Sequence, residues 1–152
     1  MNISIEYLAG LIEGEGSFLA KANGGAAITV EMTDQDIVER LLTFGGTVHG
    51  YAARKINWEP TWRWSLTSKL AFDLAKELLP YLGIRRTEQA TRMMQQYQDS
   101  INRQTSTKTN IINRTATIKQ LRSENNWTHQ RIADELGVDR TLVSHTLRGK
   151  FG

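Results

Sequence analysis

The spacing of apolar residues near the start of the chain predicts an amphipathic helix. Ile5, Leu8 and Ile12 recur three and four positions apart, which places them on one helical stripe. Ser4 precedes this stripe and is a favourable N-cap. Gly16 follows it and suits the turn out of a helix.

The segments after this helix alternate between strand and helix patterns, and the intervening Asn23-Gly24-Gly25 is typical of a hairpin turn. The order predicts an α+β unit of helix, two strands, helix, two strands and two helices. The expected strands are Ser17–Lys21, Ala26–Met32, Thr47–Lys55 and Thr61–Thr67, and the expected helices run from the Thr33–Asp36 cap to Phe44, from Lys69 to Leu82 and from Thr87 to about Asp99.

The end of the chain predicts two short helices joined by a tight turn. Thr128 and Asp139 are suitable caps for the first and second of these helices. Ala133, Gly137 and Val143 stand at the spacing of a helix-turn-helix, where a small residue, a turn glycine and a crossing residue are needed. The remaining apolar residues of a small core are Ile132, Leu136, Val138 and Leu147, with Trp127 and Ile118 to Leu121 expected beside them.

Residues 99–117 separate these two regions and are rich in Ser, Thr, Asn and Gln. Such a composition buries too little apolar area to fold alone, which favours a solvated polar linker. The alternative is a segment that lies along a DNA groove and becomes ordered on binding. The expected division is therefore 1–98, a linker at 99–117, and a small all-α domain at 118–152.

Composition and charge narrow the function classes. The 152 residues are 39% hydrophobic, which supports a packed core, and the absence of cysteine excludes disulfides and thiolate metal sites. No stretch has the composition of a signal peptide or a membrane span, so a soluble, cytoplasmic protein is expected. Residues 99–152 hold nine Lys and Arg against five Asp and Glu, so this part is the more obvious partner for phosphate.

The first helix also carries the clearest candidate chemistry. Glu13 and Glu15 lie near its C-terminal end, where the helix dipole is negative and a carboxylate is unfavourable unless a cation or backbone donors compensate. Gly10 and Gly14 lack side chains, so a second helix backbone can approach closely. These features indicate a metal site at a subunit interface.

The run LAGLIEGEG at residues 8–16, followed by Ser17-Phe18, resembles the LAGLIDADG motif of homing endonucleases, with Glu in place of both Asp residues. Val30–Asp34 and Leu79–Ala90 resemble two later segments of that family. The alternative is a buried amphipathic helix that ends in two solvated acids. The resemblance covers about residues 1–98 and implies an αββαββα domain with a saddle-shaped antiparallel sheet that lies on DNA.

The resemblance also implies roles for individual residues. Glu15 matches the metal-binding acid and the Gly14 carbonyl a backbone ligand, whereas Glu13 matches an acid for which a structural role is expected. The metal would be Mg²⁺ or another divalent ion such as Mn²⁺, which prefers oxygen ligands, and the nucleophile would be water, without an organic cofactor. Asp34 or Gln35, and Arg85 or Arg86, are candidates for completing the catalytic site, with Asp34 and Arg85 preferred.

One motif per chain implies a homodimer that pairs through Leu8, Gly10, Leu11 and Gly14 and reads a pseudo-palindromic site in double-stranded DNA. Strand alternation places one set of side chains on the DNA face if Trp62, Trp64 and Leu66 point inward. That set comprises Lys21, His49, Tyr51, Lys55, Arg63, Ser65 and Thr67, with Arg54 at a strand end. The tail resembles the helix-turn-helix of bacterial and phage regulators, which implies DNA contacts from Arg140, Thr141, Ser144, His145 and Arg148.

The resulting hypothesis is a site-specific homing endonuclease that hydrolyses both strands of DNA in a metal-dependent reaction and is encoded in an intron or another mobile element. Two alternatives remain open at this point. One is a non-catalytic transcription regulator, because some regulators resemble a degenerate domain of this kind fused to a helix-turn-helix. The other is an intron maturase, which some members of the family become.

Overall fold

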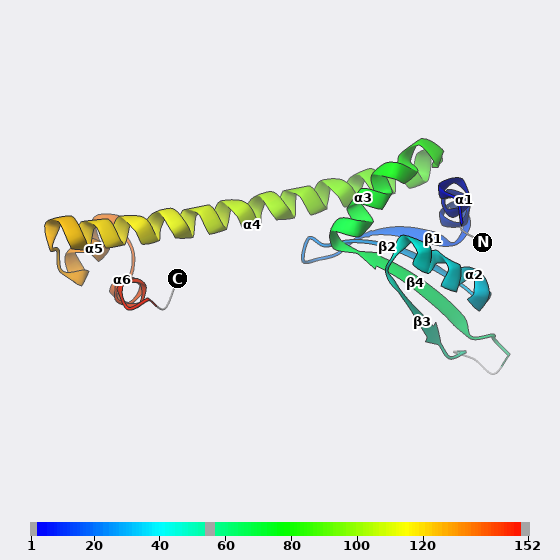
Figure 1. Cartoon of the computed structure of the whole chain (residues 1–152), viewed down its shortest axis with the longest axis horizontal. Coiled ribbons are helices and arrows are strands. Elements are labelled where there is room, and N and C mark those ends of the chain that lie inside the picture. Colours follow the sequence, from blue (N-terminus) through cyan, green and yellow to red (C-terminus); the bar gives the residue numbers. More distant parts are fainter. Residues whose placement is uncertain (1–2, 54–56, 150–152) are drawn as a thin grey trace. The chain divides into compact units, whose positions relative to one another are not determined.

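The computed structural model describes residues 3–53 and 57–149. The chain divides into two compact units, Met1–Ile101 and Asn102–Gly152. Helix α4, Ile84–Asn125, is continuous, so it contributes its first part to the N-terminal unit and the rest to the C-terminal unit (Figure 1).

Helix α1, Ile5–Glu15, forms as its apolar stripe predicts. Its N-cap is Ser4, whose Oγ accepts a hydrogen bond from the Tyr7 amide at 3.3 Å. Gly16 follows immediately, and a Cβ atom there would lie 2.6 Å from Ile12 Cα. The chain can therefore turn directly from helix into strand only because residue 16 has no side chain.

Four antiparallel strands form one sheet in the order β1-β2-β4-β3, which confirms the α+β class. The strands are β1, Gly16–Ala20; β2, Ala26–Met32; β3, Thr47–Tyr51; and β4, Thr61–Thr67. Strand β3 is shorter than expected, since it ends at Tyr51, and the predicted DNA contacts Arg54 and Lys55 lie outside the described residues.

Two further helices belong to this unit, one between the second and third strands and one after the fourth, and each is followed by a 3₁₀ turn that the periodicity did not predict. They are α2, Gln35–Arg40, followed by η1, Leu41–Phe44, and α3, Ser68–Leu78, followed by η2, Leu79–Tyr81. Pro80 has no amide hydrogen and cannot continue the α-helical hydrogen bonding, which explains the early end of α3. Gly45 and Gly46 end η1 with φ of +86° and +88°, as glycine allows.

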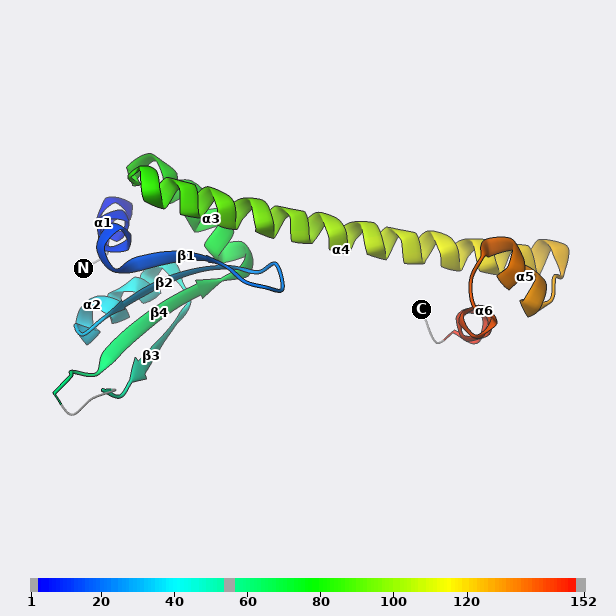
Figure 2. The same ribbon diagram turned by 180° about the vertical axis from the view of Figure 1, so that it is seen from behind.

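The core of this unit lies between the helices and one face of the sheet. Ile28 and Val30 of β2 and Trp64 and Leu66 of β4 are buried there, together with α1 and α3 residues. In Figure 1, α2 lies in front of the sheet, and in the reverse view of Figure 2 the strands lie in front of α2. The polar residues that alternate with the buried ones therefore face away from this core.

Helix α4 differs from the expectation at both ends. It begins at Ile84 instead of Thr87, and it continues through residues 99–117, for which the sequence predicts a solvated polar linker or a segment that becomes ordered on DNA. The segment remains solvated, because nearly every side chain from Ile101 to Thr117 is exposed. Ala90 and Met93 are buried in the first core and Ile118 in the second, so packing at each end stabilises a helical stretch that is mostly polar and buries little of its own surface.

The C-terminal unit contains the expected pair of short helices, α5, His129–Leu136, and α6, Arg140–Leu147. Thr128 and Asp139 cap them through side-chain hydrogen bonds, and Gly137 adopts the left-handed conformation with φ of +62°. The core consists of Ile118, Ile132, Ala133 and Val143, with Leu121, Trp127, Leu136, Val138 and Leu147 packed around it.

Among the described residues, no helix is both long enough and apolar enough to cross a membrane.

Trp64 provides a test of the first core. Its ring is fully buried and its Nε1 donates a hydrogen bond to the Gly45 carbonyl at 2.8 Å. We expect Trp64→Ala to lower the free energy of unfolding by about 3–5 kcal/mol, measured by urea unfolding and circular dichroism. Trp58 is 58% exposed, so Trp58→Ala is the control and should cost less than about 1 kcal/mol. Equal losses would contradict this core.

Candidate functional site

The end of α1 meets the beginning of α4 through the side chain of Glu13. Its Oε1 accepts a hydrogen bond from the Gly83 amide at 2.7 Å. Gly83 precedes α4 and its carbonyl accepts the first helical hydrogen bond, from the Thr87 amide at 2.9 Å. The carboxylate thus satisfies a donor at the positive end of a helix, which compensates its own place at the negative end of α1.

The two neighbouring arginines lie in different environments. Arg86 is 6% exposed; its guanidinium donates to the Glu13 carbonyl at 3.2 Å and to Gln89 Oε1 at 2.9 Å. Its Nε has no hydrogen-bond partner within the described part of the chain. Arg85, the preferred candidate from the sequence, is exposed. The cation that the structure brings to the end of α1 is therefore Arg86, because residue 86 is on the buried side of α4.

Glu15 differs from Glu13 in having an exposed side chain. None of the described residues forms a hydrogen bond or an ion pair with its carboxylate. A carboxylate at the C-terminal end of a helix lies in an unfavourable field, so an external cation would find an available ligand there.

One side of α1 is exposed at Gly10 and Gly14, which lack side chains. A Cβ atom at Gly10 or Gly14 would meet no heavy atom within 4 Å among residues 3–53 and 57–149, apart from its own helix and chain neighbours. Leu11 is half-buried beside this face. Leu8, the fourth residue expected at a dimer interface, is fully buried in the core of its own chain, because it shares the apolar stripe with Ile12.

The polar face of the sheet is centred on Arg63. Its register partners across the sheet are Glu31 in β2 and His49 in β3. Glu31 accepts hydrogen bonds from Arg63 Nε at 2.7 Å and from Thr61 Oγ1 at 2.9 Å, and the Arg63 guanidinium lies 4.9 Å from the centre of the Tyr51 ring. Hydrogen bonding to Glu31 raises the pKa of Arg63. The strand alternation that identified Arg63 did not identify Glu31 as its partner, because β2 and β4 are not consecutive and their register depends on how the whole unit packs.

The other candidates of this unit are distributed over the same sheet. Ser65 is half-exposed and Thr67 and His49 are exposed, on strands β4 and β3. Lys21 is exposed in the turn after β1, where its amide donates to the Gly25 carbonyl at 2.7 Å. Asp34 is exposed at the start of α2.

Asp34 and its neighbour Gln35 follow the end of β2. Strand β1 begins at Gly16, which pairs with Val30 near that end, so Glu15 and Asp34 belong to the same end of the sheet. The Gln35 side chain is engaged, since its Nε2 donates to Glu39 Oε1 at 2.7 Å. Asp34 makes no side-chain hydrogen bond to its own helix.

In the C-terminal unit, the candidates on α6 and at its end differ in exposure. Arg140, Thr141 and Arg148 are exposed, whereas Ser144 and His145 are half-buried. Asp139, the N-cap, accepts from the Thr141 amide at 2.6 Å, and the hydrogen bonds from Thr141 lower the pKa of Asp139. The cap orients the first turn of α6, which carries Arg140 and Thr141.

Within the described part of the chain, no three His, Asp or Glu side chains lie close enough together to hold a metal ion. The available donors at the end of α1 are one exposed carboxylate and a backbone carbonyl, and Glu13 is occupied by Gly83. Such a set suits a hard divalent ion that takes its other ligands from water, phosphate or a second chain.

Among the solved structures similar to this chain are two of one homing endonuclease. One is the homing endonuclease I-CvuI in complex with the I-CreI target in 2 mM Mg, with the DNA not cleaved; it has a TM-score of 0.43 and 22% identity over 60% of this chain and 63% of that one. This chain thus spans less than two thirds of that structure.

The other is I-CvuI in complex with its target in 2 mM Ca, with a TM-score of 0.49 and 17% identity over 95% of this chain and 92% of that one. No family model and no curated protein matches the sequence. At these values neither likeness decides the function.

The different surroundings of Glu13 and Glu15 generate a stability prediction. We expect Glu13→Ala to lower the free energy of unfolding by about 0.5–2 kcal/mol, because the Gly83 amide loses its acceptor, whereas Glu13→Gln retains an acceptor and most of the stability. Glu15→Ala is the matched control and should change stability by less than about 1 kcal/mol. Urea unfolding measures all three variants. A larger loss for Glu15→Ala than for Glu13→Ala would contradict the assignment.

Proposed function

We propose that this protein is a homing endonuclease of the LAGLIDADG type, which cuts both strands of a specific DNA site in a metal-dependent hydrolysis. The main support is the contrast at the end of α1. Glu13 is held by the Gly83 amide, while Glu15, two residues on, is exposed and lacks a hydrogen-bond partner among the described residues. A purely structural helix end has no need of a second, uncompensated carboxylate.

In this proposal Glu15 and the Gly14 carbonyl would hold Mg²⁺ or Mn²⁺, and the ion would supply Lewis acidity for the hydrolysis of the phosphodiester. The Glu13 hydrogen bond to Gly83 fixes the direction in which α1 ends, and so positions Glu15. Arg86 donates to the Glu13 carbonyl at 3.2 Å, which places a permanent positive charge behind the site. Arg86 therefore replaces Arg85 as the proposed cation, and Asp34 remains a candidate for orienting the attacking water.

The proposed active form is a homodimer in which two α1 helices pack through Gly10, Leu11 and Gly14. The open space at both glycines supports this, because a second backbone can approach to contact distance there. A two-fold axis at this face brings two Glu15 carboxylates together and matches a pseudo-palindromic site.

The remaining surfaces would contact DNA. The polar face of the sheet offers Arg63, His49 and Lys21, with Arg63 neutralised by Glu31. An arginine paired with a glutamate adds little net charge for phosphate binding. It is better suited to contact the edge of a base, where the hydrogen-bond donors of the guanidinium contribute to sequence specificity. Helices α5 and α6 are proposed to act as a helix-turn-helix, with exposed Arg140 and Thr141 at the start of α6 and Arg148 at its end.

A second candidate is a transcription regulator that binds DNA without cutting it. The observation in its favour is the pair of capped helices α5 and α6, whose exposed Arg140 and Thr141 could contact DNA without a metal ion. A regulator would bind its site with or without divalent metal, and would tolerate loss of the Glu15 carboxylate.

Glu15→Gln distinguishes the two candidates. On a target selected by cleavage of a randomised plasmid library in Mg²⁺, we expect this variant to cut at least about 1000-fold more slowly, because the metal ligand is lost, while it binds the same duplex as tightly or more tightly. Glu6→Gln, the same substitution at the other end of α1, is the control and should cut normally. Undiminished cutting by the Glu15 variant, or cutting by the unmodified protein in EDTA, would refute the proposed site.

Gly10→Leu tests the proposed dimer. The side chain meets open space in the single chain, and leucine favours helix over glycine by about 0.5–1 kcal/mol, so we expect the melting temperature to be kept or raised. Sedimentation should show a monomer and cleavage should be lost, since the added side chain separates the two helices. Glu77→Leu, at an exposed position of α3, is the control and should remain a cutting dimer. A dimeric Gly10→Leu protein that still cuts would refute this interface.

A further inference from the structure

The middle of α4 has an unusual distribution of charge. From Ser100 to Ser123 the chain contains five cationic residues and no acid. They are Arg103, Lys108, Arg114, Lys119 and Arg122. A solvent-exposed helix usually carries both acidic and basic side chains, because acid–base pairs one turn apart stabilise it. In this stretch the cationic side chains repel one another without compensating acids, which favours binding to a polyanion.

The helix gathers these cations on one side. At 3.6 residues per turn, the five positions fall within about 160° of the circumference, and Arg103 to Lys119 extends along about 24 Å of the axis. Ser106, Thr109 and Asn113 occupy the opposite side and are uncharged. Since the whole stretch is helical, the charges are held in a fixed array before any partner binds.

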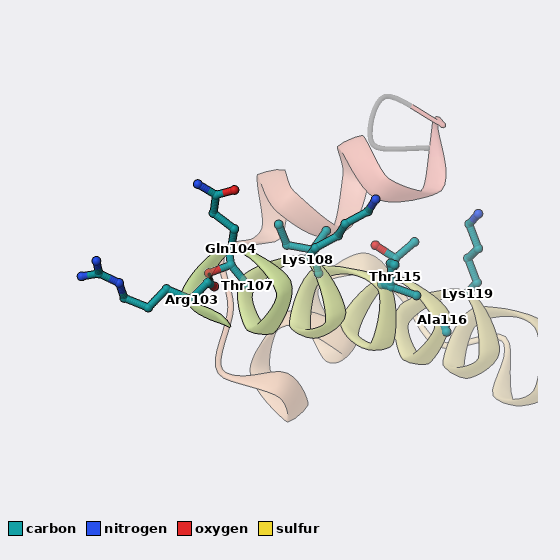
Figure 3. A pocket seen from close by; sticks show the side chains of 9 residues that line it. Arg103, Gln104, Thr107, Lys108, Thr115, Ala116 and Lys119 are labelled. Carbon is teal, nitrogen blue, oxygen red and sulfur yellow. Dashed lines mark hydrogen bonds between the residues drawn. The ribbon is translucent and has the colours of Figure 1, made fainter. Parts of the chain in front are cut away.

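Three of the cations line a groove of about 870 Å³ along this side of α4. The groove is formed by Arg103, Gln104, Thr107, Lys108, Ile111, Ile112, Thr115, Ala116 and Lys119. In Figure 3 the side chains of Gln104, Lys108 and Lys119 extend from the same side of the helix. Within the described residues, no hydrogen bond or ion pair engages the charged ends of Arg103, Lys108 or Lys119, whereas Arg122 donates to the Trp127 carbonyl at 2.7 Å.

We propose that this side of α4, which we call the α4 basic face and define by Arg103, Lys108, Arg114 and Lys119, binds the sugar-phosphate backbone of duplex DNA. The inference rests on the proposed DNA-binding function and adds a third contact surface to the sheet and α6. The cations match phosphates in charge, and Ile111 and Ile112, exposed by 44% and 57%, suit the apolar edges of deoxyribose.

Pairing with a second copy of α4 fits less well. Two copies of the α4 basic face would bring like charges together, and the described residues of this face offer no acid to a partner. Its apolar residues are also too few for a continuous interhelical seam, which needs an apolar residue at most of the positions three and four apart.

The experiment compares two triple variants of the full chain that change the net charge equally. The face variant carries Arg103→Gln, Lys108→Gln and Lys119→Gln, and the control carries Ser106→Glu, Thr109→Glu and Asn113→Glu on the opposite side of the helix. The probe is a random-sequence duplex of ~40 base pairs, since backbone contacts are independent of sequence. Affinity is measured over a series of KCl concentrations, and circular dichroism checks that both variants keep the helix.

We expect the slope of log affinity against log KCl concentration to become less steep by about 0.9 for each phosphate contact that the face variant loses. At ~0.1 M salt this corresponds to a loss of affinity of about eightfold per contact, and of about 500-fold for three contacts. The control should lose much less, and sedimentation of the free protein should be the same for both. Equal losses in the two variants, or unchanged salt dependence in the face variant, would refute the α4 basic face alone. Dissociation of the free protein in the face variant would assign this face to an interface between copies. An unmodified chain that binds no duplex at any salt would refute the proposed function as well.

Discussion

The hydrogen bond between Glu13 and the Gly83 amide joins two elements that are seventy residues apart in the chain. It satisfies a backbone donor at the start of α4 and offsets the unfavourable place of a carboxylate at the end of α1. Arg86, buried beneath it, donates to the Glu13 backbone carbonyl. Together these contacts define the direction of the last turn of α1, on which the exposed Glu15 carboxylate depends.

The same turn depends on a steric constraint. Gly16 packs so closely on Ile12 that any Cβ atom would collide with its backbone, and β1 begins at that residue. The apolar stripe of α1 therefore packs against the sheet, while Gly10 and Gly14 lie on the exposed side of the helix. A helix that buries one side and exposes two glycines on another is suited to packing on a second helix, so the proposed dimer contact and the proposed metal ligand belong to the same eleven-residue element.

The two units differ in whether their cationic side chains are paired with acids. In the N-terminal unit the Arg63 guanidinium is paired with Glu31 on the sheet face, so that face offers geometry more than net charge. In the C-terminal unit the cations of α4 have no acids within the same stretch of sequence. In the proposed function this division would suit the two parts of DNA recognition, since base edges require directed donors and the backbone requires positive charge.

Local sequence patterns determined most of the secondary structure. Three features were predictable because each depends on residues within a few positions of one another. They are the helix α1 that Ser4 caps, the hairpin at Asn-Gly-Gly, and the helix caps Thr128 and Asp139. Glu15 and the glycines of α1 were also candidates from the sequence alone. The composition of residues 99–117 suggested a linker, but packing of Met93 and Ile118 at either end holds it as helix.

Only the tertiary structure decided which acid and which arginine are engaged. The family resemblance already separates Glu13 from Glu15 and prefers Arg85 over Arg86, but the contact of Glu13 with Gly83 and the burial of Arg86 arise only where α1 meets α4. Leu8 was assigned to an interface because of its place in a motif, although burial against the sheet makes it core. Contacts such as these join residues far apart in the chain, so local propensity carries no information about them, whereas packing and long-range hydrogen bonding do.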